Sequence, residues 1–256
     1  DGVLEAVQAT GFVKGTVNRW PELHEVAMGN DARLSDARSW HRFQSGDDLS
    51  GHQPNPFFVR APNGRFYDLA RELGLDDPMV SRGLATADVD GDGKLDFAVA
   101  NQWETSYFFR NDSPSRDAFL GLHLLLPVHQ NDLLNDLPSD SQSASGNTRV
   151  RAGHPGVDTF GRPAIGAAAA VSLPDGRRLV AQVDGGNGHS GKRSPDVHFG
   201  LGALAPGDRL PVTVQWRDPK GQAHQENFSL TPGWHTLVLG QAQQATGQRS
   251  QGGVGQ

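Results

Sequence analysis

Four aspartates near the middle of the chain have the spacing of a metal-binding loop. They alternate with small or apolar residues within the sequence DVDGDGKLD: Asp88, Asp90, Asp92 and Asp96. Ca²⁺ takes six to eight oxygen ligands, so carboxylates at alternate positions together with one backbone carbonyl can surround it. The predicted ligands are these four carboxylates and the carbonyl oxygen of Lys94, and the predicted cofactor is Ca²⁺.

The EF-hand is the first alternative for this spacing, but an EF-hand loop requires a bidentate glutamate at its twelfth position. Counted from Asp88, that position is Val99. Apolar residues alternate with others on both sides of the loop, which predicts two strands joined by the loop. An acidic turn without metal is the other alternative, because Asp and Gly are ordinary turn formers. Repulsion among four carboxylates favours the metal loop.

The first five residues repeat the second half of this loop. Asp1-Gly2-Val3-Leu4-Glu5 matches Asp92-Gly93-Lys94-Leu95-Asp96. We therefore expect Asp1 and Glu5 to be the last carboxylates of a second, incomplete loop, and the chain to be the C-terminal portion of a larger protein. The alternative is a natural N-terminus that has this sequence by coincidence.

Composition restricts the class of protein. The 256 residues include 32 Gly and 16 Pro but no Cys, and the net charge is −6. Frequent Gly and Pro favour turns and short strands, the acidic balance does not support nucleic-acid binding, and the lack of Cys excludes disulfides and thiolate chemistry. We expect no transmembrane segment in this chain.

Turn signals divide the rest of the chain. Residues 14–55 are predicted to be a long, mostly irregular excursion, and residues 131–162 a polar surface insertion. Asn63-Gly64 and Asp175-Gly176 each stand between apolar runs and predict two hairpins. Residues 241–256 form a low-complexity tail that we expect to be disordered.

The central stretch resembles a known repeat. DVDGDGKLDFAVAN followed by YFFRND is similar to the FG-GAP/VCBS repeat, and residues 58–68 resemble the segment that precedes each such loop. The resemblance implies blades of an integrin-like β-propeller, with at least one complete blade and part of another. Phenylalanines recur at blade positions and are expected in the core: Phe57, Phe58, Phe66, Phe108 and Phe109.

The second half resembles the ASPIC/UnbV family. The similarity rests on Ile165-Gly166-Ala167, the glycines of 185–188, Ser194-Pro195 and the run His198-Phe199-Gly200-Leu201-Gly202, followed by a strand containing VQW. Ala168 stands where the family usually has Arg. Any site built on that Arg is therefore not expected here.

Catalytic motifs are weak. Asp184, His189 and Ser190 are close in sequence, but their setting lacks the strand, nucleophile and helix of a hydrolase elbow. The glycine-rich run GGNGHSGK is followed by Arg193 where a phosphate-binding loop needs Ser or Thr. We expect a protein that is not an enzyme.

These observations predict an all-β chain with three parts. Residues 1–116 are terminal blades of a calcium-binding β-propeller, 117–240 a β-sandwich-like ASPIC/UnbV domain, and 241–256 the tail. The expected function is an extracellular or periplasmic interaction or scaffold module. Its expected partners are a protein that binds the 14–55 and 131–162 loops, and an upstream propeller segment or a companion chain. The alternative is an enzyme or accessory protein of a biosynthetic pathway.

Overall fold

A computed structural model describes residues 2–29, 31–115, 117–128, 141–142, 148–186, 191–205 and 207–240. Strands are the main regular structure of this part of the chain, and its two α-helices are short: α1 (Trp20–Ala27) and α2 (Asp31–Ser35). The predicted all-β class is confirmed. The chain forms two compact units, one of residues 1–116 with 185–194 and the other of residues 117–184 with 195–256.

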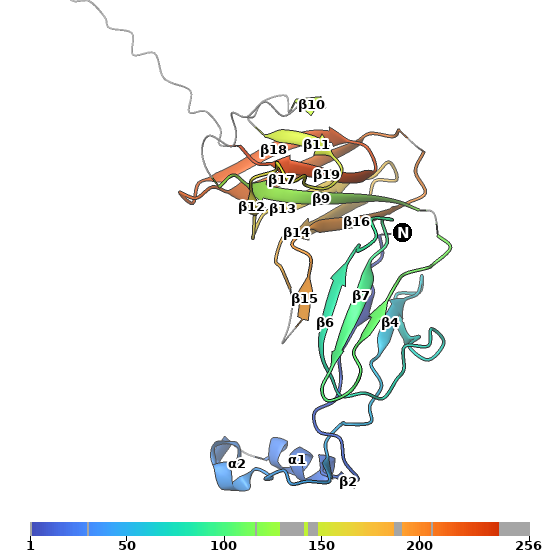
Figure 1. Cartoon of the computed structure of the whole chain (residues 1–256), viewed down its shortest axis with the longest axis vertical. Coiled ribbons are helices and arrows are strands. Elements are labelled where there is room, and N and C mark those ends of the chain that lie inside the picture. Colours follow the sequence, from blue (N-terminus) through green and yellow to red (C-terminus); the bar gives the residue numbers. More distant parts are fainter. Residues whose placement is uncertain are drawn as a thin grey trace, which may run out of the picture. The chain divides into compact units, whose positions relative to one another are not determined.

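The first unit, the blade unit, contains two main sheets (Figure 1). The three-stranded sheet has the order β1 (Ala6–Val7), β4 (Phe57–Arg60) and β5 (Phe66–Asp68). The four-stranded sheet has the order β15 (Gly191–Arg193), β6 (Ser81–Ala87), β7 (Asp96–Asn101) and β8 (Tyr107–Phe109). Both sheets are open, as terminal propeller blades would be.

The strand register repeats between these two sheets. Ala6 and Val7 pair with Phe58 and Phe57, as Ala98 and Val99 pair with Phe108 and Tyr107. The repeat at the start of the chain is therefore present in the backbone pairing. It is one residue shorter there, because Glu5 directly precedes Ala6 whereas Phe97 stands between Asp96 and Ala98.

Strand β15 joins the blade unit although it is remote in sequence. We expected residues 185–194 within the second domain, but Gly191 pairs in parallel with Leu84 of β6. Position 186 needs glycine, because Gly186 has a φ of +147° and a Cβ there would lie 2.6 Å from the carbonyl oxygen of Gly191. Strands β15 and β6 are more than eighty residues apart in the sequence. Because a parallel pair needs such a long connection, no local sequence pattern predicts it.

The 14–55 segment, expected to be mostly irregular, contains several short regular elements. Besides α1 and α2, the segment holds a 3₁₀ turn (Ala37–Ser39) and the parallel pair β2 (Val17–Asn18) and β3 (Asp47–Asp48). Asn18 Oδ1 accepts a hydrogen bond from the Trp20 N–H at 2.9 Å at the start of α1. The helices were missed because they are too short to show apolar periodicity.

Buried Asp47 organises this segment. Its carboxylate accepts hydrogen bonds from Arg19 Nε and the Gln44 backbone N–H, each at 2.8 Å, and lies 2.8 Å from His41 Nε2. The bonds to His41, then to Arg19, lower the pKa of Asp47 well below its usual range. These polar contacts help to hold the segment together.

A chain of hydrogen bonds between polar side chains also joins the ends of the blade strands. Asn55 Oδ1 accepts from the Thr10 N–H, Asn55 Nδ2 donates to Ser81 Oγ, and Ser81 Oγ donates to Asn101 Oδ1, all at 2.8 Å. Asn55 and Ser81 are buried. These bonds fix the two sheets of the unit to each other.

Aromatic rings fill the space between these sheets. Phe97 lies 4.9 Å from Phe109 and 6.3 Å from Phe57, measured between ring centroids. The core prediction is wrong for two of the five phenylalanines, because Phe66 and Phe108 are 57% and 55% exposed. Strand alternation places them on the face opposite Phe57 and Phe109.

The second unit, the sandwich unit, consists of two facing sheets. One contains, in spatial order, β10 (Ser141–Gln142), β11 (Arg149–Ala152), β19 (Gly233–Val238), β9 (Ala118–Leu126) and β12 (Arg162–Pro163), with β16 (Val197–Gly202) also paired to β9. The other has the order β14 (Arg178–Gln182), β13 (Ala168–Ser172), β17 (Leu210–Arg217) and β18 (Ala223–Leu230). The Asp175-Gly176 turn joins β13 to β14, as predicted.

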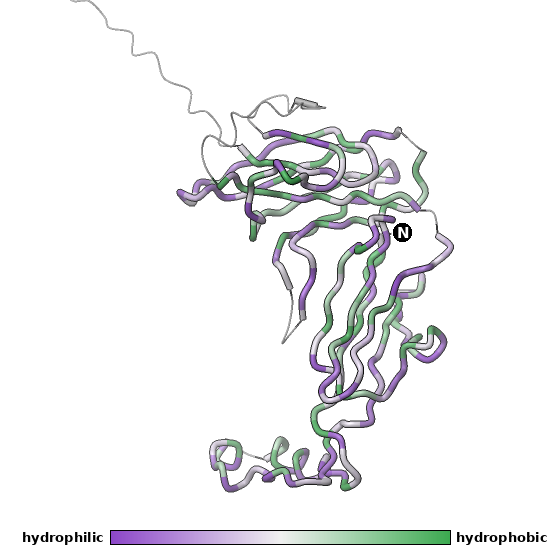
Figure 2. Tube along the Cα trace, viewed as in Figure 1, coloured by the Kyte–Doolittle hydropathy of each residue, from purple (hydrophilic) through white to green (hydrophobic). Residues whose placement is uncertain are grey.

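Alternate residues of the central strands form the sandwich core. Leu120, Leu122 and Leu124 of β9 are fully buried, and β17 buries Val212 and Val214 in the same cluster. Figure 2 shows apolar residues along these strands and hydrophilic residues at many turns. Period-two burial on one face of each sheet is the pattern of a packed sandwich.

The predicted 131–162 insertion is only partly a loop. Its residues 149–152 form β11, which pairs antiparallel with β19, and Val150 is buried in the core. Residues 131–140 and 143–147 of the insertion, like the 241–256 tail, lie outside the described residues. Where the structure describes the chain, no helix has the length and apolarity needed to cross a membrane.

Candidate metal centre

The aspartate loop connects β6 to β7, as the period-two flanks predicted. Gly91 and Gly93 have φ values of +76° and +89°. These left-handed conformations favour glycine, so the two glycines let the loop reverse over a few residues. The loop thereby carries its acidic side chains to the end of a fixed strand pair.

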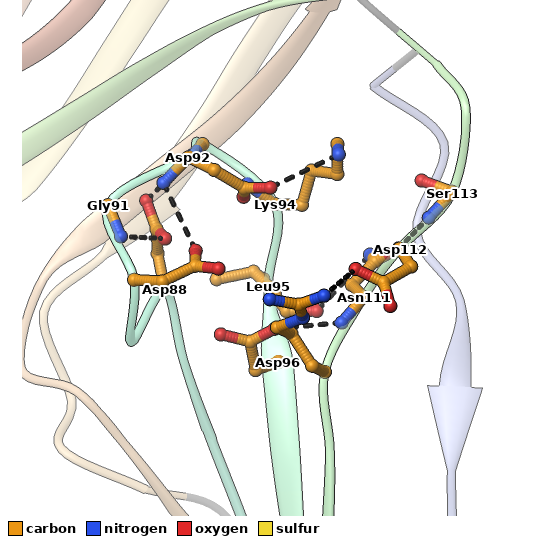
Figure 3. A network of polar contacts seen from close by, with 12 residues as sticks. Asp88, Gly91, Asp92, Lys94, Leu95, Asp96, Asn111, Asp112 and Ser113 are labelled. Atoms are coloured by element: carbon orange, nitrogen blue, oxygen red, sulfur yellow. Dashed lines mark hydrogen bonds and ion pairs between the residues drawn. The ribbon is translucent and has the colours of Figure 1, made fainter.

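Three of the four predicted carboxylates converge. Asp88, Asp90 and Asp96 each offer an oxygen, and these oxygens lie within 4.8 Å of one another. Asp88 is also oriented by the loop backbone, since its two oxygens accept hydrogen bonds from the N–H groups of Gly91 and Gly93, both at 2.9 Å (Figure 3).

Asp96 is the buried member of this group, which we call the carboxylate triad (Asp88, Asp90 and Asp96). Its side chain accepts from the N–H of Val89 at 3.0 Å and from the N–H of Asn111 at 2.8 Å. Asn111 lies just beyond β8, and its side chain donates to the Leu95 carbonyl at 3.3 Å. The third strand of the blade therefore helps position the triad.

Sequence reasoning did not assign Asn111 to the site. Its signal was present, because YFFRND belongs to the resemblance, but the contact depends on β8 pairing with β7. Its role is to orient Asp96 through the backbone.

Asp92 and Lys94 lie differently. The Asp92 carboxylate accepts from the Lys94 N–H at 2.9 Å and forms a 3.1 Å ion pair with Lys94 Nζ. The backbone bond, then the ammonium group, lowers the pKa of Asp92. Asp92 is outside the carboxylate triad, so its place in the five-ligand set remains a prediction, as does that of the Lys94 carbonyl.

Two other groups of residues singled out in the sequence lie partly outside the described residues. They are the second predicted loop, with Asp1 and Glu5, and the set of Asp184, His189 and Ser190. Asp1 lies outside the described residues, and Glu5 is exposed just before β1. His189 and Ser190 of the weak catalytic set also lie outside the described residues.

The donor set fits a hard divalent cation. All three converging groups are carboxylates, and oxygen ligands suit Ca²⁺ better than softer metals. Backbone N–H groups donate to all three carboxylates and so help to orient them. Such an ion would join the end of β6 to the start of β7.

Two protein-family models match the chain. The FG-GAP repeat model matches residues 82–113, which comprise most of β6, the aspartate loop, β7 and β8. The model named ASPIC and UnbV matches residues 158–246. Comparison with curated proteins gives no match. The chain thus carries an FG-GAP repeat followed by an ASPIC/UnbV domain, which confirms the resemblance predicted from its sequence.

Proposed function

We propose that the carboxylate triad binds one Ca²⁺ and that the chain is a non-catalytic interaction module of an integrin-like repeat protein. The convergence of Asp88, Asp90 and Asp96 carries this proposal. FG-GAP repeats commonly bind Ca²⁺, and the oxygen-only donor set is what that ion requires. The bound ion would stabilise the loop between β6 and β7 and, through Asn111, the end of β8.

Calcium binding is tested by thermal unfolding with Ca²⁺ or EDTA. Binding to the native state alone stabilises by about 2.7 kcal/mol at a hundredfold excess over Kd. We expect Asp88→Asn to abolish this difference, because it removes one member of the triad. The matched control is Asp76→Asn, which alters a carboxylate of the same unit outside the loop. A melting temperature indifferent to EDTA in the unaltered protein would refute the proposal.

We further propose a location outside the cytoplasm. FG-GAP repeats occur mainly in extracellular or periplasmic proteins, and a loop of this type is most useful where Ca²⁺ is plentiful. Extracellular calcium modules bind with Kd values of about 10⁻⁴–10⁻³ M. Calorimetry should therefore give a Kd in or near this range. A nanomolar Kd would instead indicate a site suited to cytoplasmic calcium.

The 14–55 segment is our proposed partner surface. Its side chains include large apolar groups that face solvent, among them Trp20 (49% exposed), Met28 (75%) and Trp40 (39%). Exposed aromatic residues are common anchors of protein interfaces. Replacing Trp20 and Trp40 by Ala should abolish capture of a partner from the native source while the fold is retained. The control is Trp103→Ala, which removes an exposed tryptophan of the same unit outside the segment. If both variants capture the same proteins as the original chain, this surface has no such role.

A further inference from the structure

The sandwich unit carries a cluster of histidines and aromatic rings. Neighbouring strands of the six-stranded sheet bring together Asp196 just before β16, His123 in β9, Trp234 in β19 and His154 just after β11. On β9, His123 alternates with the buried Leu122 and Leu124, so its side chain lies on the face away from the core. The four residues span more than a hundred positions, and no sequence motif connects them.

The imidazole of His123 has a neighbour at each ring nitrogen. Nδ1 lies 2.5 Å from Asp196 Oδ1, and Nε2 lies 2.9 Å from Nδ1 of His154. Asp196 and His123 are mostly buried, with side-chain exposures of 14% and 12%, whereas His154 is exposed. The pair of facing nitrogens is therefore rigid on the His123 side and accessible on the His154 side.

Trp234 supports both imidazoles. Its ring lies 4.7 Å from that of His123 at an interplanar angle of 22°, and 4.9 Å from that of His154 at 38°. The indole can lie there because Gly121, its partner across the strand pair, has no side chain: a Cβ would come within 2.3 Å of the indole. The sheet thus fixes the ring of His123, and Trp234 supports the ring of His154, which lies beyond the end of β11.

We propose that His123 Nε2 and His154 Nδ1 bind a divalent transition metal of the copper or nickel class. Imidazole nitrogens bind such metals at about 2.0–2.1 Å, and two ligands at right angles in a tetragonal site are then about 2.9 Å apart. The observed separation has this value, but in the metal-free protein it is a hydrogen bond. The ring centroids lie 5.1 Å apart, so the two nitrogens point at each other, and the exposed His154 ring must tilt for both nitrogens to face one ion. With the Nδ1–H of His123 given to Asp196, the hydrogen between the facing nitrogens belongs to Nδ1 of His154. When a metal binds at that nitrogen, His154 carries its hydrogen on Nε2 instead, by exchange with solvent.

Asp196 completes the arrangement as a positioning residue. Histidines that bind metal usually give their other ring N–H to a carboxylate, which fixes the ring and makes the ligand nitrogen more basic. Asp196 has this relation to His123. Water would fill the other coordination positions on the exposed side of His154.

The site differs from the carboxylate triad in ligand type, so the two can be tested separately. Imidazole suits copper, nickel and zinc, whereas carboxylates suit calcium. The test is a Cu²⁺ titration in saturating Ca²⁺, followed by tryptophan fluorescence. Bound Cu²⁺ should quench Trp234, because its indole contacts both histidines. Trp234→Phe should remove this quenching while calorimetry still detects binding.

Substitutions then assign the ligands. His123→Ala and His154→Ala should each weaken Cu²⁺ binding at least tenfold, and Asp196→Asn about 10–100-fold, as is usual for such outer carboxylates. His24→Ala, which removes an exposed histidine of α1, should leave the affinity within twofold. Unchanged affinity in both His123→Ala and His154→Ala would overturn the proposal.

One measurement is independent of any variant. The electron paramagnetic resonance spectrum of the unaltered protein with one equivalent of Cu²⁺ should show hyperfine coupling to two imidazole nitrogens. A spectrum with oxygen ligands alone would place the copper elsewhere, for example on the carboxylate triad. That result would overturn the copper site and leave the calcium proposal untouched.

Discussion

In the sandwich unit, the central strands bury rows of Leu and Val side chains in one continuous cluster. Every residue of that cluster lies between Ala118 and Leu239. Among the described residues of the blade unit, by contrast, buried polar side chains are almost as many as buried apolar ones: Asp47, Asn55, Ser81 and Asp96. The sandwich unit also buries polar side chains, but its buried apolar residues far outnumber them. The two units share strand alternation but differ in what is buried.

The difference follows from strand length and setting. Strands β1, β5 and β8 have only two or three residues, and the sheets that contain them are open. Such strands bury little apolar surface, so hydrogen bonds, ion pairs and the proposed cation must supply much of the blade's stability. We therefore expect the sandwich to respond to apolar substitutions and the blade to polar substitutions and ion removal.

The largest expected effect is in the sandwich core. Leu122→Ala should lower the free energy of unfolding by about 2–5 kcal/mol, because it removes a fully buried side chain and leaves a cavity. Chemical denaturation followed by circular dichroism measures the change. Leu4→Ala, at a position 86% exposed, serves as the control and should have almost no effect. A loss that depended on Ca²⁺ would contradict the proposed division between the units.

The second prediction separates the members of the aspartate loop. Asp96→Asn should remove the stabilisation by Ca²⁺, about 2.7 kcal/mol at a hundredfold excess of the ion over Kd. Asp92→Asn should retain most of that stabilisation, because Asp92 pairs with Lys94 outside the triad. Differential scanning calorimetry with and without Ca²⁺ distinguishes them. Equal losses in both variants would support the five-ligand set instead.

The third prediction concerns the polar chain between the blade sheets. Asn55→Ala should cost about 1–3 kcal/mol, because it leaves the Thr10 N–H and Ser81 Oγ without their buried partner. Asn227→Ala removes an exposed asparagine from β18 and provides the matched control. If both variants had the same free energy of unfolding, the buried hydrogen bonds of Asn55 would contribute no more to stability than a surface contact does.

The fourth prediction is the acid response of the 14–55 segment. The pKa of Asp47 is lower in the folded protein than its usual value near 4, so its contribution is complete above about pH 4 and decreases as the pH falls further. Asp47→Asn should therefore destabilise the segment at pH 7, and this difference should narrow toward pH 2. Proteolysis rates of the segment at both pH values provide the measurement. If the difference instead widened in acid, the ionised form of Asp47 would not be the form that stabilises the segment, and the prediction would be wrong.

Several parts of the molecule could be predicted from the sequence because they depend on neighbouring residues. The aspartate loop, the Asn63-Gly64 and Asp175-Gly176 turns and the alternating strands all follow from local preferences of Gly, Asn and Asp and from the two-residue period of a strand. The family resemblance also rests on short contiguous runs. For these features, the sequence determined both the element and its place in the chain.

Other parts were decided only by tertiary structure. The pairing of β15 with β6, the contact of Asn111 with Asp96, and the meeting of His123, His154 and Asp196 join residues from 15 to more than 100 positions apart. Such contacts depend on which strands pair and in which register, and a shift of one residue would turn each side chain to the other face. The start of α1 depends likewise on the contact of Arg19 with Asp47. Local sequence therefore supplied the ligands of the proposed calcium loop, whereas the sheet alone created the histidine pair.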